Sequence, residues 1–316
     1  MPILDDLVSD LGFSFKDVSR IISTAPARYK VYGIPKRDGG FRIIAQPSRE
    51  LKLIQRYILE NKLNKCKIHE CATAYVKNKS IYENAEVHKS ADKIIKLDFI
   101  NFFNSIKPRD WRAMAPKLDG CLFEASDLEI YIKIFFWGHV KNSSVPRCLS
   151  VGAPTSPSIS NILMYDFDQA VFAAAKDLNI NYTRYADDIT LSGDSISHLH
   201  KMESHVRKSL KIISFPKISI NEKKRGLFTR AGRRSVTGLI ITPDGSISIG
   251  RDKKRLISAM VHHFVTGEMT EEGKAKLKGW LAFCVDNEIE FVERLRIKYG
   301  NEAISKALKY YIKPLS

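Results

Sequence analysis

Apolar residues recur every three or four positions in several parts of the chain, which is the spacing of an amphipathic helix. Over residues 4–23 this pattern is interrupted at Gly12 and predicts two short helices. Pro157 is well placed in the first turn of a long helix, predicted over 157–178. The segment 126–129 fits a capping box at the start of another helix. Further helices are predicted over 48–64, 197–212 and 252–312, the last with breaks near Gly267 and Gly300.

Short β-like runs between turn residues predict the strands. Residues 29–44 form two such runs around a Gly-Gly turn, which is a hairpin signal. An apolar run over 91–98 ends in a carboxylate, and the runs 181–185 and 189–192 flank a tight turn. A second hairpin is predicted from runs over 235–242 and 246–249, on either side of a Pro-Asp-Gly turn. Alternating strands and helices, followed by a helical tail, indicate an α/β or α+β core with an all-α C-terminal part.

The composition of the 316 residues, 44% hydrophobic and 27% charged, excludes a wholly disordered chain. No apolar run is long enough to cross a bilayer, and the acidic start does not resemble a secretory signal. The five cysteines are odd in number and form no CxxC pair, which argues against a disulfide scaffold or a zinc ribbon. We therefore expect a cytoplasmic protein with no membrane partner.

The net charge of +16 is unevenly distributed. Residues 201–316 hold 24 basic and 12 acidic side chains, and therefore +12 of that excess. This asymmetry indicates a polyanion-binding half joined to a nearly neutral half. The alternative is a solvated basic surface that serves solubility.

Three acids carry the candidate chemistry. Asp187 and Asp188 occupy the tight turn between two strands, where surface acids are also common, and Asp98 ends the buried strand. Strand ends along one edge of a sheet can gather distant acids around a cation. Magnesium takes oxygen ligands, and two such ions can assist a hydroxyl to displace pyrophosphate. The spacing therefore predicts a carboxylate site for a hard metal ion.

These residues also carry a family resemblance. Residues 185–188, Tyr-Ala-Asp-Asp, resemble the YADD box of reverse transcriptases, and residues 96–103 resemble their LDxxxFF motif. Three further boxes resemble those of the family: the GxPxSP segment at 152–157, the lysine motif at 221–224 and the fingers hairpin from 34–36 to 46–48. The boxes occur in the family's order and span roughly residues 28 to 242, and the resemblance covers essentially the whole chain. The NAxxH pattern at 84–88 and the VTG pattern at 236–238 resemble those of bacterial retron reverse transcriptases.

The resemblance implies an α+β, right-hand polymerase fold with intertwined fingers and palm and a helical thumb. The domains it implies are an N-terminal helical segment at 1–27, fingers at 28–95 with 111–149 contributing, palm at 96–110 and 150–235, and a thumb and RNA-binding C-terminal region at 236–316.

The resemblance also implies catalytic residues. Asp98 and Asp187 would bridge two Mg²⁺ ions, Asp188 would be a weaker ligand, and the backbone carbonyl of Phe99 would complete the shell of one ion.

For deoxynucleoside triphosphates, the resemblance implies contacts from several residues. Phe103 would be a steric gate against a ribose 2′-hydroxyl, although a core phenylalanine is the alternative. Lys36 and Arg42 would contact the triphosphate, although cations on loops are usually only solvated. Lys223 or Lys224 would protonate the leaving pyrophosphate, and Lys223 is taken as the nucleotide-binding residue. Small residues at Gly152 and Ala153 would let the backbone approach a base pair, and Val151 stands where the family commonly has glutamine.

RNA contacts are considered for the NAxxH pattern, for Arg184 and for the region around the VTG pattern. Asn84 and His88 would either grip RNA or brace the fingers against the palm. Arg184 would bind primer phosphate or pair with Asp166 or Asp168. Around the VTG pattern we expect contacts from Arg233, Arg234, Val236, Thr237, Gly238, Arg251 and Lys254.

The function implied is RNA-templated DNA synthesis on one cognate structured noncoding RNA, which serves as template and primer. Initiation at a guanosine 2′-hydroxyl would yield RNA-linked single-stranded DNA, in an antiphage defence setting with an accessory effector protein. Two alternatives remain open. One is a group II intron-like or CRISPR-associated enzyme that extends 3′-hydroxyl primers, and the other is a catalytically silent RNA-binding scaffold.

Overall fold

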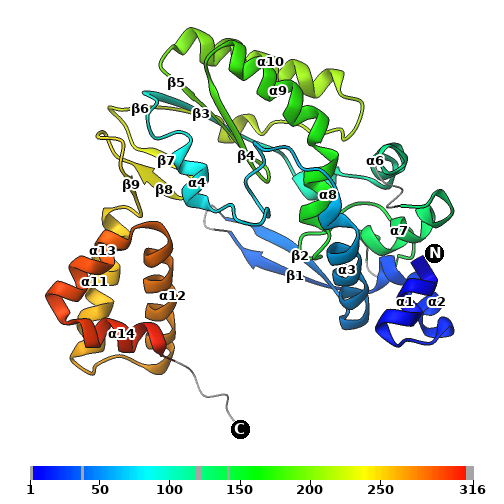
Figure 1. The fold of residues 1–316 in the computed structure, drawn as a ribbon, viewed down its shortest axis with the longest axis horizontal. Helices are drawn as coiled ribbons and strands as arrows, with labels where there is room; N and C mark the ends of the chain where they lie inside the picture. The colour runs from blue at the N-terminus through cyan, green and yellow to red at the C-terminus, as the bar shows by residue number, and fades with distance from the viewer. Residues whose placement is uncertain (1–2, 37–38, 119–122, 141–142, 311–316) are drawn as a thin grey trace.

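The computed structural model describes residues 3–36, 39–118, 123–140 and 143–310 (Figure 1). Two large hydrophobic clusters organise these residues, and a small third one joins Ala45, Trp137 and Cys148. The first is built from side chains between Ile3 and Ile220. The second is built mostly from side chains between Val236 and Ala307, joined by Ala85 and Ile94. The polypeptide between the two clusters is short, since one strand ends at Thr229 and the next begins at Arg234.

The first cluster surrounds a four-stranded antiparallel sheet. Its strand order is β4–β5–β3–β6, with bounds Asn181–Tyr185, Asp188–Gly193, Lys93–Asp98 and Gly226–Thr229. Ile95 and Leu97 of β3 and Leu191 of β5 are buried because two helices, α9 (Tyr165–Asp177) and α10 (Ile196–Ile212), cover the sheet (Figure 1). The predicted strands over 91–98, 181–185 and 189–192 are confirmed.

The N-terminal half adds helices and a hairpin. The predicted helix pair over 4–23 is confirmed as α1 (Ile3–Leu11) and α2 (Phe15–Ser23). The predicted hairpin is confirmed as β1 (Tyr29–Pro35) and β2 (Phe41–Pro47), and Ser48 then caps α3 (Arg49–Asn61). The shorter helices are α4 (Ile81–Glu86), α5 (Phe102–Ser105), α6 (Pro108–Met114) and α7 (Leu128–Phe135).

Two helix predictions are corrected. The long helix after Pro157 is divided at Met164 into α8 (Ser156–Leu163) and α9. The capping box at 126–129 is wrong, because Asp127 is the N-cap of α7 and makes no side-chain cap. The Asp127 carboxylate instead accepts a hydrogen bond of 2.6 Å from the backbone N–H of Ile3, a tertiary contact that outweighs the local motif.

The second cluster holds a three-stranded sheet and four helices. The strands are β7 (Arg234–Val236), β8 (Leu239–Ile241) and β9 (Ile247–Ser248), and the helices are α11 (Arg251–Val265), α12 (Glu271–Asn287), α13 (Ile289–Tyr299) and α14 (Asn301–Lys309). The hairpin around Pro243 is confirmed, but the run 235–242 is not one strand. Thr237 and Gly238 have φ of 47° and 84°, so they form a two-residue turn that reverses the chain. The boundary predicted at residue 236 therefore falls within β7.

In the part of the chain that the structure describes, no helix combines the length and apolar character needed to span a membrane.

Candidate active site

Strand register brings the three predicted acids together. Asp98 at the end of β3 lies opposite Asp188 at the start of β5, and Asp187 precedes Asp188 in the turn. Ala186 makes this turn with φ of 56°. The N–H of Phe99 donates to the Asp187 carbonyl at 3.0 Å, which ties the two strand ends together. The acids therefore share one end of the sheet.

Burial and mutual repulsion shape the electrostatics of this cluster. Asp98 is 7% exposed. Burial, followed by the neighbouring Asp187, raises the pKa of Asp188 to about 6. Burial also raises the pKa of Asp187, and Asp98 adds to that shift. The clustered negative charge thus makes Asp187 and Asp188 harder to ionise, which is the electrostatic state that a bound cation relieves.

Lys224 supplies a cation to the cluster. Its Nζ lies 2.7 Å from Oδ2 of Asp98, and this hydrogen bond raises the pKa of the lysine. The neighbouring Lys223, which the sequence predicts as the nucleotide-binding lysine, is exposed. Of the two adjacent lysines, Lys224 is the one in contact with a predicted catalytic acid, Asp98.

The donor set fits a hard metal ion. The side-chain donors at this end of the sheet are carboxylates, which Mg²⁺ prefers to nitrogen and sulfur. As the side chains stand, the described ranges contain no group of three His, Cys, Asp or Glu residues arranged to hold a metal. The Lys224 side chain is 54% exposed and can leave Asp98 without disturbing the core.

A buried ion pair holds the backbone of the turn at Ala186. Arg184 and Asp168 have fully buried side chains, and the guanidinium Nη2 lies 2.6 Å from Oδ2 of Asp168. The Nη1 atom donates to the Ala186 carbonyl and to Oδ1 of Asn161, both at 3.1 Å. Of the two roles considered for Arg184, pairing with Asp168 is the one observed. The network holds the backbone that carries the acids.

The β1–β2 hairpin carries the predicted triphosphate contacts. Arg42 lies on β2, and its positive charge partly opposes the rise in pKa that burial and Asp98 cause at Asp187, so Arg42 acts on the acidic end of the sheet. Lys36 follows β1, is exposed, and donates its backbone N–H to the Gly40 carbonyl at 3.0 Å. The triphosphate contacts of Lys36 and Arg42 stay predictions.

Phe103 stands beside an aromatic residue that the sequence analysis missed. Its ring lies 5.4 Å from that of Phe102 and 6.5 Å from that of Tyr75. Phe103 is only partly buried, whereas Phe99 and Phe102 are core residues. Tyr75 lies outside every recognised motif, and no spacing in the sequence connects it with the acids.

Gly152 is required by its neighbours. Its φ is 125°, and a Cβ added there would lie 3.0 Å from the Ala45 carbonyl oxygen of β2. The Ala45 N–H donates to the Val151 carbonyl at 2.8 Å. A close backbone approach is therefore observed toward β2, where it joins the hairpin to the segment before α8, and the approach to a base pair stays a prediction. Ala153 is buried next to it.

The NAxxH residues are structural in this conformation. His88 is fully buried, and its Nδ1 and Nε2 lie 2.7 Å from the hydroxyls of Ser192 and Thr183. Asn84 is also buried, hydrogen-bonded to Thr73 at 3.1 Å and to Thr237 at 3.4 Å. The predicted RNA contact of Asn84 and His88 does not fit this placement, because no polar atom of His88 faces solvent. The bracing alternative does.

The basic C-terminal residues differ in exposure. Arg234 is 1% exposed and donates to the carbonyls of Ala91 and Thr242, so its predicted RNA contact does not fit either. Lys254 is half-buried and pairs with Glu288. Val236 is in the core, and Thr237 donates to the Ile81 carbonyl at 3.1 Å. The exposed members of the predicted set are Arg233, Gly238 and Arg251.

Burial of His88 predicts a pH-dependent stability. Burial lowers its pKa to about 3, against about 6.5 in the unfolded chain. His88 is therefore protonated in the unfolded state and stays neutral in the folded state, so stability falls as pH drops below about 6.5. Between pH 8 and pH 5 this group removes about 2 kcal/mol from the free energy of unfolding.

Urea unfolding of His88→Gln tests this prediction. We expect the difference in unfolding free energy between wild type and His88→Gln to be smaller at pH 5 than at pH 8 by that amount. His200→Gln, on an exposed face of α10, is the control, and an unchanged gap for His88→Gln would contradict the prediction.

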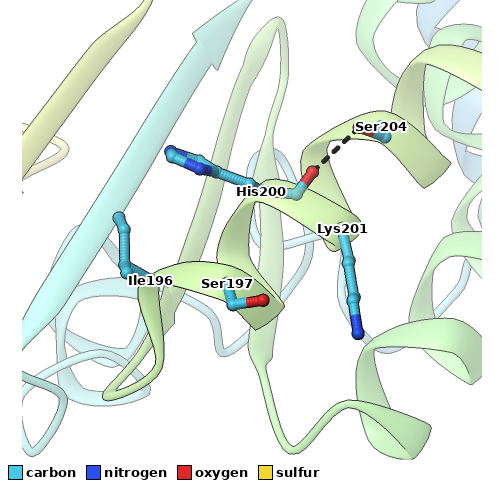
Figure 2. A pocket seen from close by; sticks show the side chains of 5 residues that line it. All are labelled: Ile196, Ser197, His200, Lys201 and Ser204. Atoms are coloured by element: carbon cyan, nitrogen blue, oxygen red, sulfur yellow. Dashed lines mark hydrogen bonds between the residues drawn. The ribbon is translucent and has the colours of Figure 1, made fainter.

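A hollow elsewhere on the surface does not belong to this site. Figure 2 shows it, lined by Ile196, Ser197, His200, Lys201 and Ser204. All five residues come from α10, which begins after Gly193, at the end of β5 remote from Asp188. Because a single helix lines this hollow, it does not bring together functional side chains from different elements.

Comparison with known proteins agrees with the geometry. Residues 34–256 match the family described as reverse transcriptase (RNA-dependent DNA polymerase). The chain is 38% identical over 308 residues to the retron Ec83 reverse transcriptase of Escherichia coli, covering 96% of this chain and 98% of that protein. It is 31% identical over 313 residues to the retron Ec86 reverse transcriptase of the same organism, covering 96% and 92%.

Among solved structures, an apo telomerase from Candida tropicalis aligns with a TM-score of 0.53 at 12% identity, over 90% of this chain and 58% of the telomerase. This likeness supports the right-hand fold of mixed helices and sheet. Taken together with the clustered acids, these matches show that the chain belongs to the reverse transcriptase family as a bacterial retron-type RNA-directed DNA polymerase.

Proposed function

We propose that this reverse transcriptase copies one cognate structured noncoding RNA, which serves as template and primer, into single-stranded DNA that stays linked to the RNA. Synthesis begins at a guanosine 2′-hydroxyl, and the product acts with an accessory effector protein in antiphage defence in the cytoplasm. Similarity to two retron reverse transcriptases over nearly the whole chain supports this proposal. The net charge of +16 suits a polyanionic partner.

The observation that carries the catalytic part is the register of β3 and β5, which sets Asp98 opposite Asp188 with Asp187 beside them. These carboxylates and the Phe99 carbonyl would hold two Mg²⁺ ions. When bound, the ions supply stabilisation for the attacking hydroxyl and the leaving pyrophosphate. The raised pKa values of Asp187 and Asp188 support this role, since divalent cations compensate clustered negative charge.

The nucleotide contacts follow from the surroundings of the acids. Arg42 and Lys36 of the hairpin bind the triphosphate, whose charge their own charges complement. Phe103 excludes the ribose 2′-hydroxyl. Arg233, Arg251 and the basic residues near them bind RNA phosphates, which provides affinity with little sequence selectivity.

The contact of Lys224 with Asp98 predicts that the two adjacent lysines contribute differently to catalysis. If Lys224 moves from Asp98 to the pyrophosphate and protonates it, Lys224→Ala lowers kcat by about a hundredfold, within the range for general acids. Lys223→Ala is the matched control and stays within about threefold of wild type. Single-turnover incorporation of one deoxynucleotide measures both. Equal losses in the two variants, or a loss only in Lys223→Ala, would contradict the assignment.

The linkage of the product tests the proposed priming. Protein purified with its bound RNA is supplied with labelled deoxynucleotides, and the product is sized before and after treatment with debranching enzyme, which cleaves 2′–5′ bonds. We expect the labelled DNA to be released from RNA by the enzyme. Labelled product that does not change in size indicates an enzyme that extends 3′-hydroxyl primers, and absence of label indicates a silent scaffold.

A further inference from the structure

Tyr75 stands beside the acidic cluster, and none of the roles above uses it. Its ring lies 6.5 Å from the ring of Phe103, at an interplanar angle of 55°. Burial raises the pKa of Tyr75, Asp187 and Tyr185 add to that shift, and Arg42 opposes it. Tyr75 thus lies beside the proposed sugar gate, Phe103, and within electrostatic reach of residues proposed to hold the triphosphate and the metal ions.

The backbone of Tyr75 is held in a costly conformation. Its φ is 60°, in the left-handed region, which costs a residue with a side chain about 1–2 kcal/mol. The ring is nevertheless 57% exposed, whereas Ala72 and Ala74 beside it are fully buried. Folding gains little from strain that leaves an aromatic ring in solvent. The strained backbone of Tyr75 is accounted for if a bound ligand covers its exposed ring.

Buried hydrogen bonds fix the segment that presents the ring. Asn161 Nδ2 donates to the Ala74 carbonyl at 2.9 Å. The Thr73 N–H donates to the Arg184 carbonyl at 2.9 Å, and the Arg184 N–H donates to Cys71 at the same distance. The network beneath the acidic turn therefore also positions Tyr75. The ring and the acids are placed by one rigid support, as preorganised substrate contacts require.

We propose that Tyr75 forms, together with Phe103, the aromatic wall of the pocket for the incoming deoxynucleotide, where its ring contacts the base and sugar. This inference rests on the nucleotide roles proposed for Phe103 and Arg42. Contact between an aromatic ring and a base contributes about 1–3 kcal/mol. Because the contact forms on binding, its loss raises KM and leaves kcat nearly unchanged.

Steady-state incorporation of dTTP on a poly(rA) template with an oligo(dT) primer tests this wall. We expect Tyr75→Ala to raise KM for dTTP about five- to hundredfold, with kcat within about threefold of wild type. Tyr75→Phe keeps the ring and stays near wild type in both constants. Phe15→Ala removes an equally exposed ring, 59% against 57%, from α2 and leaves KM unchanged.

An unchanged KM in Tyr75→Ala overturns the proposal, and so does a fall in kcat alone. Thermal unfolding of each variant verifies its folding. Should Tyr75→Ala fail to fold, Tyr75→Leu keeps apolar volume without a π face, and its KM decides in the same way. The oligo(dT) primer has an ordinary 3′-hydroxyl, so the result does not depend on 2′-hydroxyl priming. Failure of the proposed RNA-linked product would leave this comparison of KM values intact.

Discussion

Asp187→Asn is expected to lower the rate of deoxynucleotide incorporation by at least about a thousandfold. The substitution keeps the size of the side chain but removes a negative charge from the cluster formed with Asp98 and Asp188. Metal-ion stabilisation of the transition state amounts to several kcal/mol, and each ~1.4 kcal/mol changes the rate tenfold. A time course of incorporation on the co-purified RNA, with wild type and variant at equal concentration, measures the effect.

Stability provides an internal control for this prediction. Because burial and repulsion raise the pKa of Asp187, its charge destabilises the fold at neutral pH. Asp187→Asn removes that charge, so its free energy of unfolding should equal or exceed that of wild type. Asp177→Asn, an exposed acid of α9, should change neither quantity. A fully active Asp187→Asn variant would refute the assignment of this residue and favour a different catalytic centre.

Arg184→Met is expected to cost about 3–5 kcal/mol of unfolding free energy, the largest stability loss of any substitution considered. The substitution leaves the Asp168 carboxylate buried and without its ion-pair partner, and that penalty exceeds what the pair itself contributes. It also removes the hydrogen bonds to Asn161 and Ala186. Urea unfolding followed by circular dichroism measures the difference.

Two further variants separate the ion pair from simple loss of packing. The double variant Arg184→Met with Asp168→Leu removes both charges and should recover much of the stability, since a buried apolar pair avoids desolvation. Arg20→Ala breaks an exposed pair with Asp17 and should cost less than about 1 kcal/mol. A loss for Arg184→Met as small as that for Arg20→Ala would show that water reaches the pair.

Local patterns predicted most of the sheet that carries the site. The strand ending at Asp98 and the strands flanking Asp187 were recognisable because alternation and turn residues act over a few neighbours. Their convergence could be expected from the order of the reverse transcriptase boxes. The split at Met164 was not predicted, since the apolar spacing continues through it.

The missed features depend on contacts between distant residues. His88 was open to two roles because the hydroxyls that bind it, on Thr183 and Ser192, lie 95 and 104 residues away. Lys223 and Lys224 have identical side chains. Only the conformation of the turn that contains them, which precedes β6, brings Lys224 and not Lys223 to Asp98. Tyr75 owes its position to Asn161 and Arg184, which no local pattern connects with it.

The short connection between the two hydrophobic clusters has a consequence for protein engineering. Ala231 and Gly232 lie between β6 and β7 and are exposed, so a chain break there leaves every described strand and helix whole. Ala85 and Ile94 of the first fragment would still insert into the core of the second. Two co-expressed fragments divided at this point are therefore expected to associate through this shared core, which would make DNA synthesis depend on bringing the halves together.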